Sequence, residues 1–257
     1  MNTFRIEAHR GVGTTHPENT LPAFEAAVRE GYDMIELDLK FTRDDRCVAL
    51  HDRTIRRTAR HTDGTAADDT AVSDLPFSEA RSYDYGLWKG EAFRGTVLPA
   101  WEEILAFAKE NRIPLKIDNC YERFTDEQRE ILYRCIEEAD AGALVGFTCK
   151  NVQSFAEVAD RFPLAEFHYD GLIADDTFDK LRAIAGRHRT TVWIPTDSPA
   201  TAWVSPEIRR ASPAWCEEIH NAGFEVGIWL LRTEEELRTA RNLCGADIIE
   251  TDGSIKP

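Results

Sequence analysis

Two histidines and three carboxylates stand at or near the ends of apolar runs in the sequence: His9, Glu36, Asp38, His51 and Asp118. Glu36 and Asp38 are two residues apart, so on a strand both side chains would point to the same face. Unpaired carboxylates on a shared buried face repel each other unless they are protonated or bridged by a cation. A divalent cation is the simplest solution, with Asp118 as a third ligand, and an oxygen-only set favours Mg²⁺ or Ca²⁺ over zinc. The alternative for Glu36 and Asp38 is an exposed face of an edge strand.

His9 and His51 are candidates for general acid/base catalysis, in which one group takes a proton from the nucleophile and another protonates the leaving oxygen. A single histidine is more often structural, but these two are expected at adjacent strand ends beside the carboxylates. Arg10 follows His9 and could hold a phosphate with its planar guanidinium. Among the other histidines only His168, near the end of a later apolar run, is a candidate for substrate contact. The segment from residue 8 to 52 is therefore predicted to act on a phosphate ester.

The elements that would position these groups alternate along the chain between short apolar runs and segments of helical periodicity. The eight runs predicted to be strands cover residues 4–8, 33–39, 113–118, 143–148, 164–169, 190–194, 224–230 and 247–251. Seven helical segments separate them, several beginning at Pro or an N-cap residue and ending at Gly. This order predicts an α/β fold, a TIM (β/α)8 barrel forming a single domain over residues 1–257. An open doubly wound sheet is the alternative.

One further apolar run, residues 46–52, follows the second predicted strand after only a short polar turn. Parallel strands need a long crossover, so this run predicts a β-hairpin, whose returning arm would bring His51 near the level of Asp38. Residues 54–97 are rich in turn residues and lack a long helix. We expect them to form an insertion over the barrel mouth, where catalytic groups of such barrels lie, and to be a candidate substrate-binding cap.

Composition limits the classes of partner. The chain of 257 residues has a formal net charge of -15, and its one basic cluster, residues 53–60, is short, so we expect no nucleic-acid partner. That cluster is either a solvated loop or local help in holding an anion. No run of about 18 apolar residues and no signal peptide is present, so no integral membrane segment and a cytoplasmic location are expected, unless the chain has been trimmed. The six cysteines form no C-x-x-C pair and predict neither disulfides nor a zinc site. Oligomeric state is not predicted.

Several short motifs occur in a fixed order: EAHRG at 7–11, PENT at 17–20, IELDL at 35–39, VALHD at 48–52 and RT at 57–58. In this order they resemble the pattern of the glycerophosphodiester phosphodiesterase (GDPD) family, within the phospholipase-C-like phosphodiesterase superfamily. The resemblance is dense over residues 7–58 and looser over the rest of the chain.

The resemblance implies a metal-dependent phosphoric diester hydrolase that releases glycerol 3-phosphate and an alcohol. His9 and His51 would be the acid/base pair, and Glu36, Asp38 and Asp118 would hold one divalent cation, Mg²⁺ or Ca²⁺. It further implies attack by the glycerol hydroxyl next to the phosphate, giving a cyclic phosphate that water opens. An intramolecular attack of this kind has already met the entropic cost of approach.

The resemblance also implies substrate-binding residues. Arg10 would contact the phosphate and Trp229 would line the pocket. Glu18, in the PENT motif, could contact substrate, although loop shaping and N-capping are the favoured role of that motif. Where the family has Glu, a hydrophobic residue and Lys at the end of the third barrel strand, this chain has Asp118, Asn119 and Cys120, so the family's lysine is missing and Lys150 is a candidate to replace it.

Two later departures bear on the alcohol part of the substrate. The family's W-T-V-N is Trp229 followed by Leu230, Leu231 and Arg232 in this chain, and residues 194–210 form an unusually long connection. These departures leave open a related phosphodiesterase for a sugar or inositol phosphodiester. A binding protein that has kept the fold and lost the reaction is the third possibility, disfavoured by the presence of both histidines and all three carboxylates.

Overall fold

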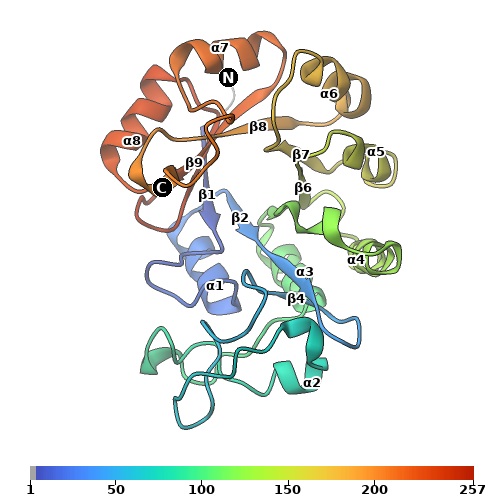
Figure 1. Ribbon diagram of the computed structural model, residues 1–257, viewed down its shortest axis with the longest axis vertical. Coiled ribbons are helices and arrows are strands. Elements are labelled where there is room, and N and C mark those ends of the chain that lie inside the picture. Colours follow the sequence, from blue (N-terminus) through green and yellow to red (C-terminus); the bar gives the residue numbers. More distant parts are fainter. Residues whose placement is uncertain (1–3) are drawn as a thin grey trace.

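Eight parallel strands close into a barrel in the computed structural model of this chain, which describes residues 4–257 (Figure 1). Around the barrel the order is β1 (Arg5–His9), β10 (Ile248–Thr251), β9 (Glu225–Leu231), β8 (Thr190–Pro195), β7 (Glu166–Tyr169), β6 (Val145–Cys149), β5 (Leu115–Ile117) and β2 (Met34–Leu37). Strand β2 pairs with β1 and completes the ring. The predicted TIM barrel is confirmed, because an open sheet would leave two unpaired edges.

Helices surround the strands on the outside of the ring (Figure 1). They are α1 (Leu21–Glu30), α3 (Trp101–Asn111), α4 (Asp126–Glu138), α5 (Gln153–Ala159), α6 (Thr177–Ala185), α7 (Pro213–Asn221) and α8 (Glu234–Arg238). All seven predicted helices are therefore present, and α8 continues as a π-helical turn over Thr239–Leu243. The local signals act as expected: Gly31 ends α1 with a φ of 88°, and the Thr125 hydroxyl accepts a hydrogen bond from the backbone N–H of Gln128 at the start of α4.

The interior of the barrel is filled rather than open. Met34, Trp193 and Ile248 form an apolar cluster there, and the Trp193 ring lies so close to Gly227 that a Cβ at that position would be 2.5 Å from it. Outward-facing residues of the strands pack instead against the helices in the main core. A filled interior confines the space for a ligand to the carboxyl ends of the strands.

A two-stranded hairpin follows β2, as predicted. Strand β3 (Leu39–Phe41) pairs antiparallel with β4 (Cys47–Ala49), with Leu39 opposite Ala49. The backbone N–H of Leu50 donates to the carbonyl of Asp38 at 3.0 Å, so the returning arm stays beside the end of β2.

The insertion after the hairpin has a small core of its own, built around Val48, Ile55 and Tyr85. Its regular elements are η1 (Val72–Asp74), α2 (Phe77–Ala80) and η2 (Glu91–Phe93); two further 3-10 helices, η3 (Asn119–Arg123) and η4 (Pro199–Thr201), follow β5 and β8. In Figure 1 the insertion lies to one side of the ring, next to α1 and α3. No helix in residues 4–257 is long and apolar enough to cross a membrane.

Candidate active site

A pocket of about 830 Å³ opens at the carboxyl ends of the strands. Its lining includes eight of the ten predicted site residues: His9, Arg10, Glu36, Asp38, His51, Asp118, Lys150 and Trp229. The first six come from the ends of β1, β2 and β5, which are adjacent in the barrel, and from the hairpin that follows β2. No residue from 54–97 is in this lining, so the insertion meets the site through other contacts.

Three carboxylates form the most acidic part of the pocket. Oxygen atoms of Glu36, Asp38 and Asp118 all lie within 4.8 Å of one another, and the first two residues are only 3% and 4% exposed. Burial, and then the nearby charges of Asp38, Glu250 and Asp118, raise the pKa of Glu36 well above its ordinary value. A buried set of oxygen ligands with this mutual repulsion fits a hard divalent cation such as Mg²⁺ or Ca²⁺, whose charge would relieve it.

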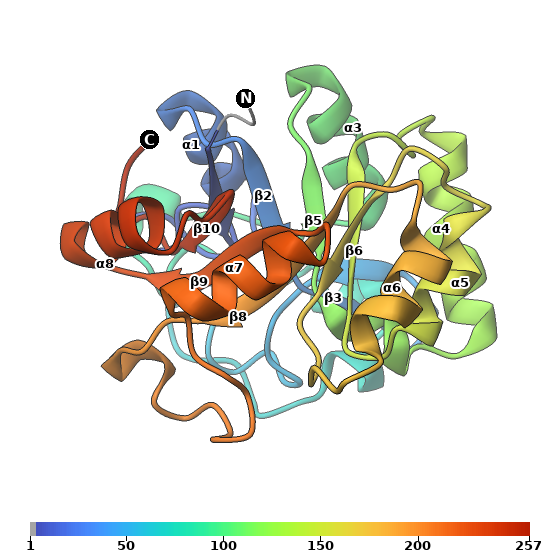
Figure 2. The same ribbon diagram turned by 90° about the horizontal axis from the view of Figure 1, so that it is seen from above.

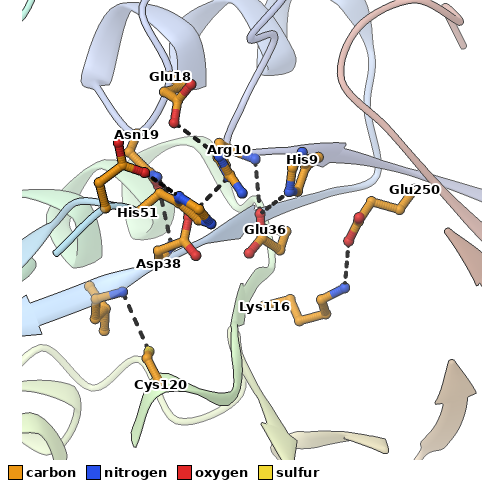
Figure 3. Close-up of polar contacts among 12 residues, drawn as sticks. His9, Arg10, Glu18, Asn19, Glu36, Asp38, His51, Lys116, Cys120 and Glu250 are labelled. Carbon is orange, nitrogen blue, oxygen red and sulfur yellow. Dashed lines mark hydrogen bonds and ion pairs between the residues drawn. The ribbon is translucent and has the colours of Figure 1, made fainter. Parts of the chain in front are cut away.

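Asn19 fixes one of these carboxylates. Its side-chain amide donates to Asp38 Oδ2 at 2.9 Å, and its amide oxygen accepts the backbone N–H of Asp38 at 3.2 Å (Figure 3). The PENT motif therefore contributes through its asparagine, which lies at the start of the first helix and holds a group at the end of the second barrel strand.

Arg10 joins the carboxylates to the first loop. Its backbone N–H donates to Glu36 Oε2 at 3.0 Å, its Nη1 donates to Glu18 Oε1 at 3.0 Å, and its Nε lies 3.2 Å from Asp38 Oδ2 (Figure 3). These contacts hold the guanidinium at the edge of the carboxylate group.

The two histidines have different surroundings. His9 Nε2 is 3.9 Å from Glu36 Oε2, and burial lowers the pKa of His9. His51 is 42% exposed, and its Nδ1 is 2.6 Å from Asp52 Oδ1. A proton on Nδ1 shared with this carboxylate would leave Nε2 of His51 able to accept a second proton.

Arg57 is a residue whose part in the site the sequence did not reveal. It belongs to the insertion, and its guanidinium donates to Asp52 Oδ2 at 2.6 Å and to both oxygens of Glu18, at 2.6 and 2.8 Å. Burial would raise the pKa of Asp52, but hydrogen bonds from Arg57 and His51 outweigh it and lower that pKa to about 2. Arg57 thus binds both Asp52, the partner of His51, and Glu18, the partner of Arg10. The sequence feature that singled out Arg57 was the RT motif at 57–58, which indicated no specific role on its own.

A second missed group lies beneath the carboxylates. Lys116 Nζ is 2.6 Å from Glu7 Oε1 and 2.9 Å from Glu250 Oε2, and it sits 3.7 Å from the centre of the Trp193 ring. Lys116 and Glu250 both line the pocket, and Figure 3 places them beside His9 and Glu36. Strand alternation could have shown this, because Lys116 precedes Asp118 by two residues and shares its face.

Cys120, which replaces the family's lysine, is turned into the wall of the site. It is 7% exposed, and its sulfur accepts the backbone N–H of Leu39 at 3.4 Å (Figure 3). The cations that do line the pocket are Arg10, Lys116, Arg123, Lys150 and Arg232. Lys150 is thus placed in the pocket, and Arg123, three residues after Cys120, is a further cation on the same turn.

Two of the predicted substrate contacts lie outside the pocket lining. His168 is completely buried, lies outside the pocket lining, and accepts a hydrogen bond from Trp193 Nε1 at 3.0 Å, so Trp193 separates it from the pocket. Glu18 is also outside the lining, because Arg10 and Arg57 hold its carboxylate. Both residues support groups that face the pocket. Trp229 does line it.

Comparison with known proteins points to one family. Residues 9–254 match the Glycerophosphoryl diester phosphodiesterase family. A glycerophosphodiester phosphodiesterase of Caldanaerobacter subterraneus is 39% identical over 104 residues, 40% of each chain, and one of Bacillus altitudinis is 26% identical over 171 residues, 65% of this chain and 60% of that protein. The chain spans less than two thirds of the length of these curated relatives.

Solved structures agree on the architecture. An Oleispira antarctica phosphodiesterase in complex with the product sn-glycerol-3-phosphate superposes with a TM-score of 0.77 at 20% identity, covering 97% of this chain and 93% of that one. A glycerophosphodiester phosphodiesterase from Agrobacterium tumefaciens gives 0.70 at 19% identity, covering 98% of both chains. At such low identity these likenesses establish the shared fold.

Proposed function

The chain belongs to the glycerophosphoryl diester phosphodiesterase family, and we propose that it hydrolyses a glycerophosphodiester to glycerol 3-phosphate and an alcohol. The observation that carries the proposal is that one pocket contains two histidines, an arginine and a group of three carboxylates. Phosphodiester cleavage requires a proton acceptor, a proton donor and positive charge at the phosphate; His9 and His51 would exchange the protons, and Arg10 together with a bound cation would supply the charge.

Glu36, Asp38 and Asp118 would hold one divalent cation, Mg²⁺ or Ca²⁺. When bound, the cation neutralises charge on the phosphate oxygens. Arg10 is held by Glu18 and Asp38 at the edge of this group, so its guanidinium can bind a phosphate oxygen without first being ordered. Lys150, which also lines the pocket, would add a second positive charge.

His9 and His51 would exchange the protons. One accepts the proton of the attacking hydroxyl while the other donates a proton to the leaving alcohol oxygen. The 2.6 Å contact between His51 Nδ1 and Asp52 fixes the orientation of that ring and leaves Nε2 for the exchange. The nucleophile in this proposal is the glycerol hydroxyl next to the phosphate, whose attack forms a cyclic phosphate. A second proton transfer then lets water open the ring.

A substrate panel with phosphorus NMR readout tests this proposal. Purified protein supplied with Mg²⁺ or Ca²⁺ should release glycerol 3-phosphate from glycerophosphoethanolamine or a simple glycerophosphate ester, and EDTA should stop the reaction. His9→Ala should abolish release, whereas His61→Ala, an exposed histidine of the insertion, should not. Cleavage of a sugar or inositol phosphodiester that contains no glycerol, with none of the glycerol esters cleaved, would instead identify the related phosphodiesterase. Absence of cleavage across the panel would refute the proposal.

A further inference from the structure

The pocket extends well beyond the carboxylates and histidines. Its far end is formed by Leu172, after β7, by Trp203, Val204 and Ile208, between β8 and α7, and by Trp229 on β9. We name these five residues the hydrophobic subsite. Figure 2 shows the segment between β8 and α7 projecting on the opposite side of the molecule from the two termini, beyond the carboxyl end of the barrel.

Two members of the hydrophobic subsite are unusually exposed. In residues 4–257 five large hydrophobic side chains are exposed, and two of them are Leu172, at 54%, and Trp203, at 77%. The Trp203 ring lies 5.8 Å from the Trp229 ring, centre to centre, at an angle of 42°. Both border one cavity, and exposed apolar side chains grouped at a pocket are typical of a ligand-binding surface.

The exposed tryptophan stands on a segment with an ordered backbone. Arg210 donates to the carbonyl of Thr201 at 2.9 Å and to that of Val204 at 3.0 Å, and the Thr201 hydroxyl donates to the carbonyl of Thr196 at 2.6 Å. These three hydrogen bonds fix the backbone of residues 196–204 at its two ends and at residue 201. Trp203 is therefore presented toward solvent by a fixed turn.

The lack of charge in the hydrophobic subsite restricts the group that it can accept. Lys150, Asp170 and Arg232 also line the pocket, and Arg232 is paired with Asp252 at 3.0 Å. The five side chains of the subsite carry no charge, so a quaternary ammonium or an amine placed among them would lose hydration without gaining a counter-charge from them. A neutral apolar group gains from burying Trp203 and Leu172 and has no such desolvation cost.

We propose that the hydrophobic subsite binds an apolar substituent, alkyl or aryl, of the phosphodiester, so that the enzyme prefers diesters of hydrophobic alcohols to those of small polar or cationic ones. This inference rests on the proposed function and concerns the second half of the same pocket. The volume of about 830 Å³ accommodates such a group together with the phosphate and glycerol parts.

A series of glycerol 3-phosphate alkyl esters, from methyl to hexyl, tests the subsite. The acidity of the leaving alcohol changes little along the series, so differences in kcat/KM report binding of the added methylenes. Burial of each methylene should raise kcat/KM roughly two- to fourfold until the subsite is filled, mainly through a lower KM.

Trp203→Ala should flatten this chain-length dependence, lowering kcat/KM for the hexyl ester more than for the methyl ester, because it removes apolar surface that the longer chain would cover. Leu164→Ala is the matched control. Leu164 is 72% exposed and precedes β7 at the amino end of the barrel, away from the pocket. This variant should keep the full dependence.

Three outcomes would overturn the inference. These are turnover that does not vary with chain length, an equal dependence in wild type and Trp203→Ala, and faster turnover of glycerophosphocholine or glycerophosphoinositol than of the hexyl ester. Failure to cleave even the methyl ester would contradict the proposed function instead. Calorimetry with uncleavable alkyl glycerophosphonates then decides the subsite separately, because affinity that is independent of chain length refutes it.

Discussion

The two ends of the pocket are built in different ways. At the phosphate end Arg10 and Arg57 both pair with Glu18, and Arg57 also holds Asp52 beside His51. The hydrophobic subsite instead presents apolar side chains from the segment after β8, from the loop after β7 and from β9, and β7 and β9 are the two strands that flank β8. Chemistry at phosphorus demands fixed geometry, because a small misplacement of a catalytic group costs much of the rate. Binding of an apolar group depends mainly on the area covered. The contrast predicts that substitutions at the phosphate end lower kcat, while those at the subsite change KM.

The largest effect should come from the histidines. His9→Ala and His51→Ala should each lower kcat about 100- to 10,000-fold for every ester of the alkyl series, because each removes a proposed proton-transfer group. Steady-state kinetics on the methyl and hexyl esters measures this, with the ratio between the two esters unchanged. A histidine variant that kept wild-type kcat and lost only the chain-length dependence would reverse the assignment of the two ends.

Metal binding should be the next largest effect. Asp38→Asn removes a charged ligand and should weaken Mg²⁺ or Ca²⁺ binding at least about tenfold. Cation at about 100 times its Kd should stabilise the wild type by about 2.7 kcal/mol, seen as a higher Tm, and the variant less. Trp203→Ala should respond to the cation as the wild type does. Equal stabilisation of Asp38→Asn and wild type would argue against the carboxylate group as the metal site.

Substitution of Arg57 tests whether its ion pairs with Glu18 and Asp52 are needed for a high kcat. Arg57→Ala should lower kcat about 10- to 100-fold, because Asp52 beside His51 and Glu18 beside Arg10 both lose the guanidinium that holds them in place. The chain-length dependence should persist. Arg57→Lys should restore only part of the rate, since a lysine lacks the planar fork that bridges two carboxylates.

The matched control for Arg57 is Arg94→Ala. Arg94 lies in the same insertion and pairs with Glu91 at 2.7 Å, but both side chains are exposed and outside the pocket. If Arg57→Ala lost no more activity than Arg94→Ala, the connection between the insertion and the catalytic groups would have no functional role.

The smallest effect concerns stability. The folded-state pKa of Asp52 is about 2, below its ordinary value of 3.8, so its contribution is complete above the unfolded pKa and is lost as the pH falls through about 2. Because Asp52 is partly exposed, Asp52→Asn should cost only about 1 kcal/mol near neutral pH, and the cost should shrink as the pH approaches about 3. Urea unfolding at several pH values measures it. The cost of Trp203→Ala should not vary with pH, and a constant cost for Asp52→Asn would contradict the electrostatic account.

Much of the architecture and the centre of the site followed from the sequence, because local spacing decides them. Alternating apolar runs and helical segments specified the strand and helix order of the barrel. The two-residue spacing of Glu36 and Asp38 put both on one face, and the short turn before residue 46 required a hairpin that returns His51 to the same level.

Contacts between residues far apart in the chain were decided only by the tertiary structure. Strand periodicity indicates which face of the strand carries His168. Only the closed barrel shows that Trp193 lies between this histidine and the pocket, so that His168 is buried. Glu18 pairs with Arg57 39 positions away, and Lys116 with Glu250 134 positions away. Such pairs depend on the stagger of the closed barrel and on how the insertion packs beside it, and neither is encoded in the spacing of a single segment.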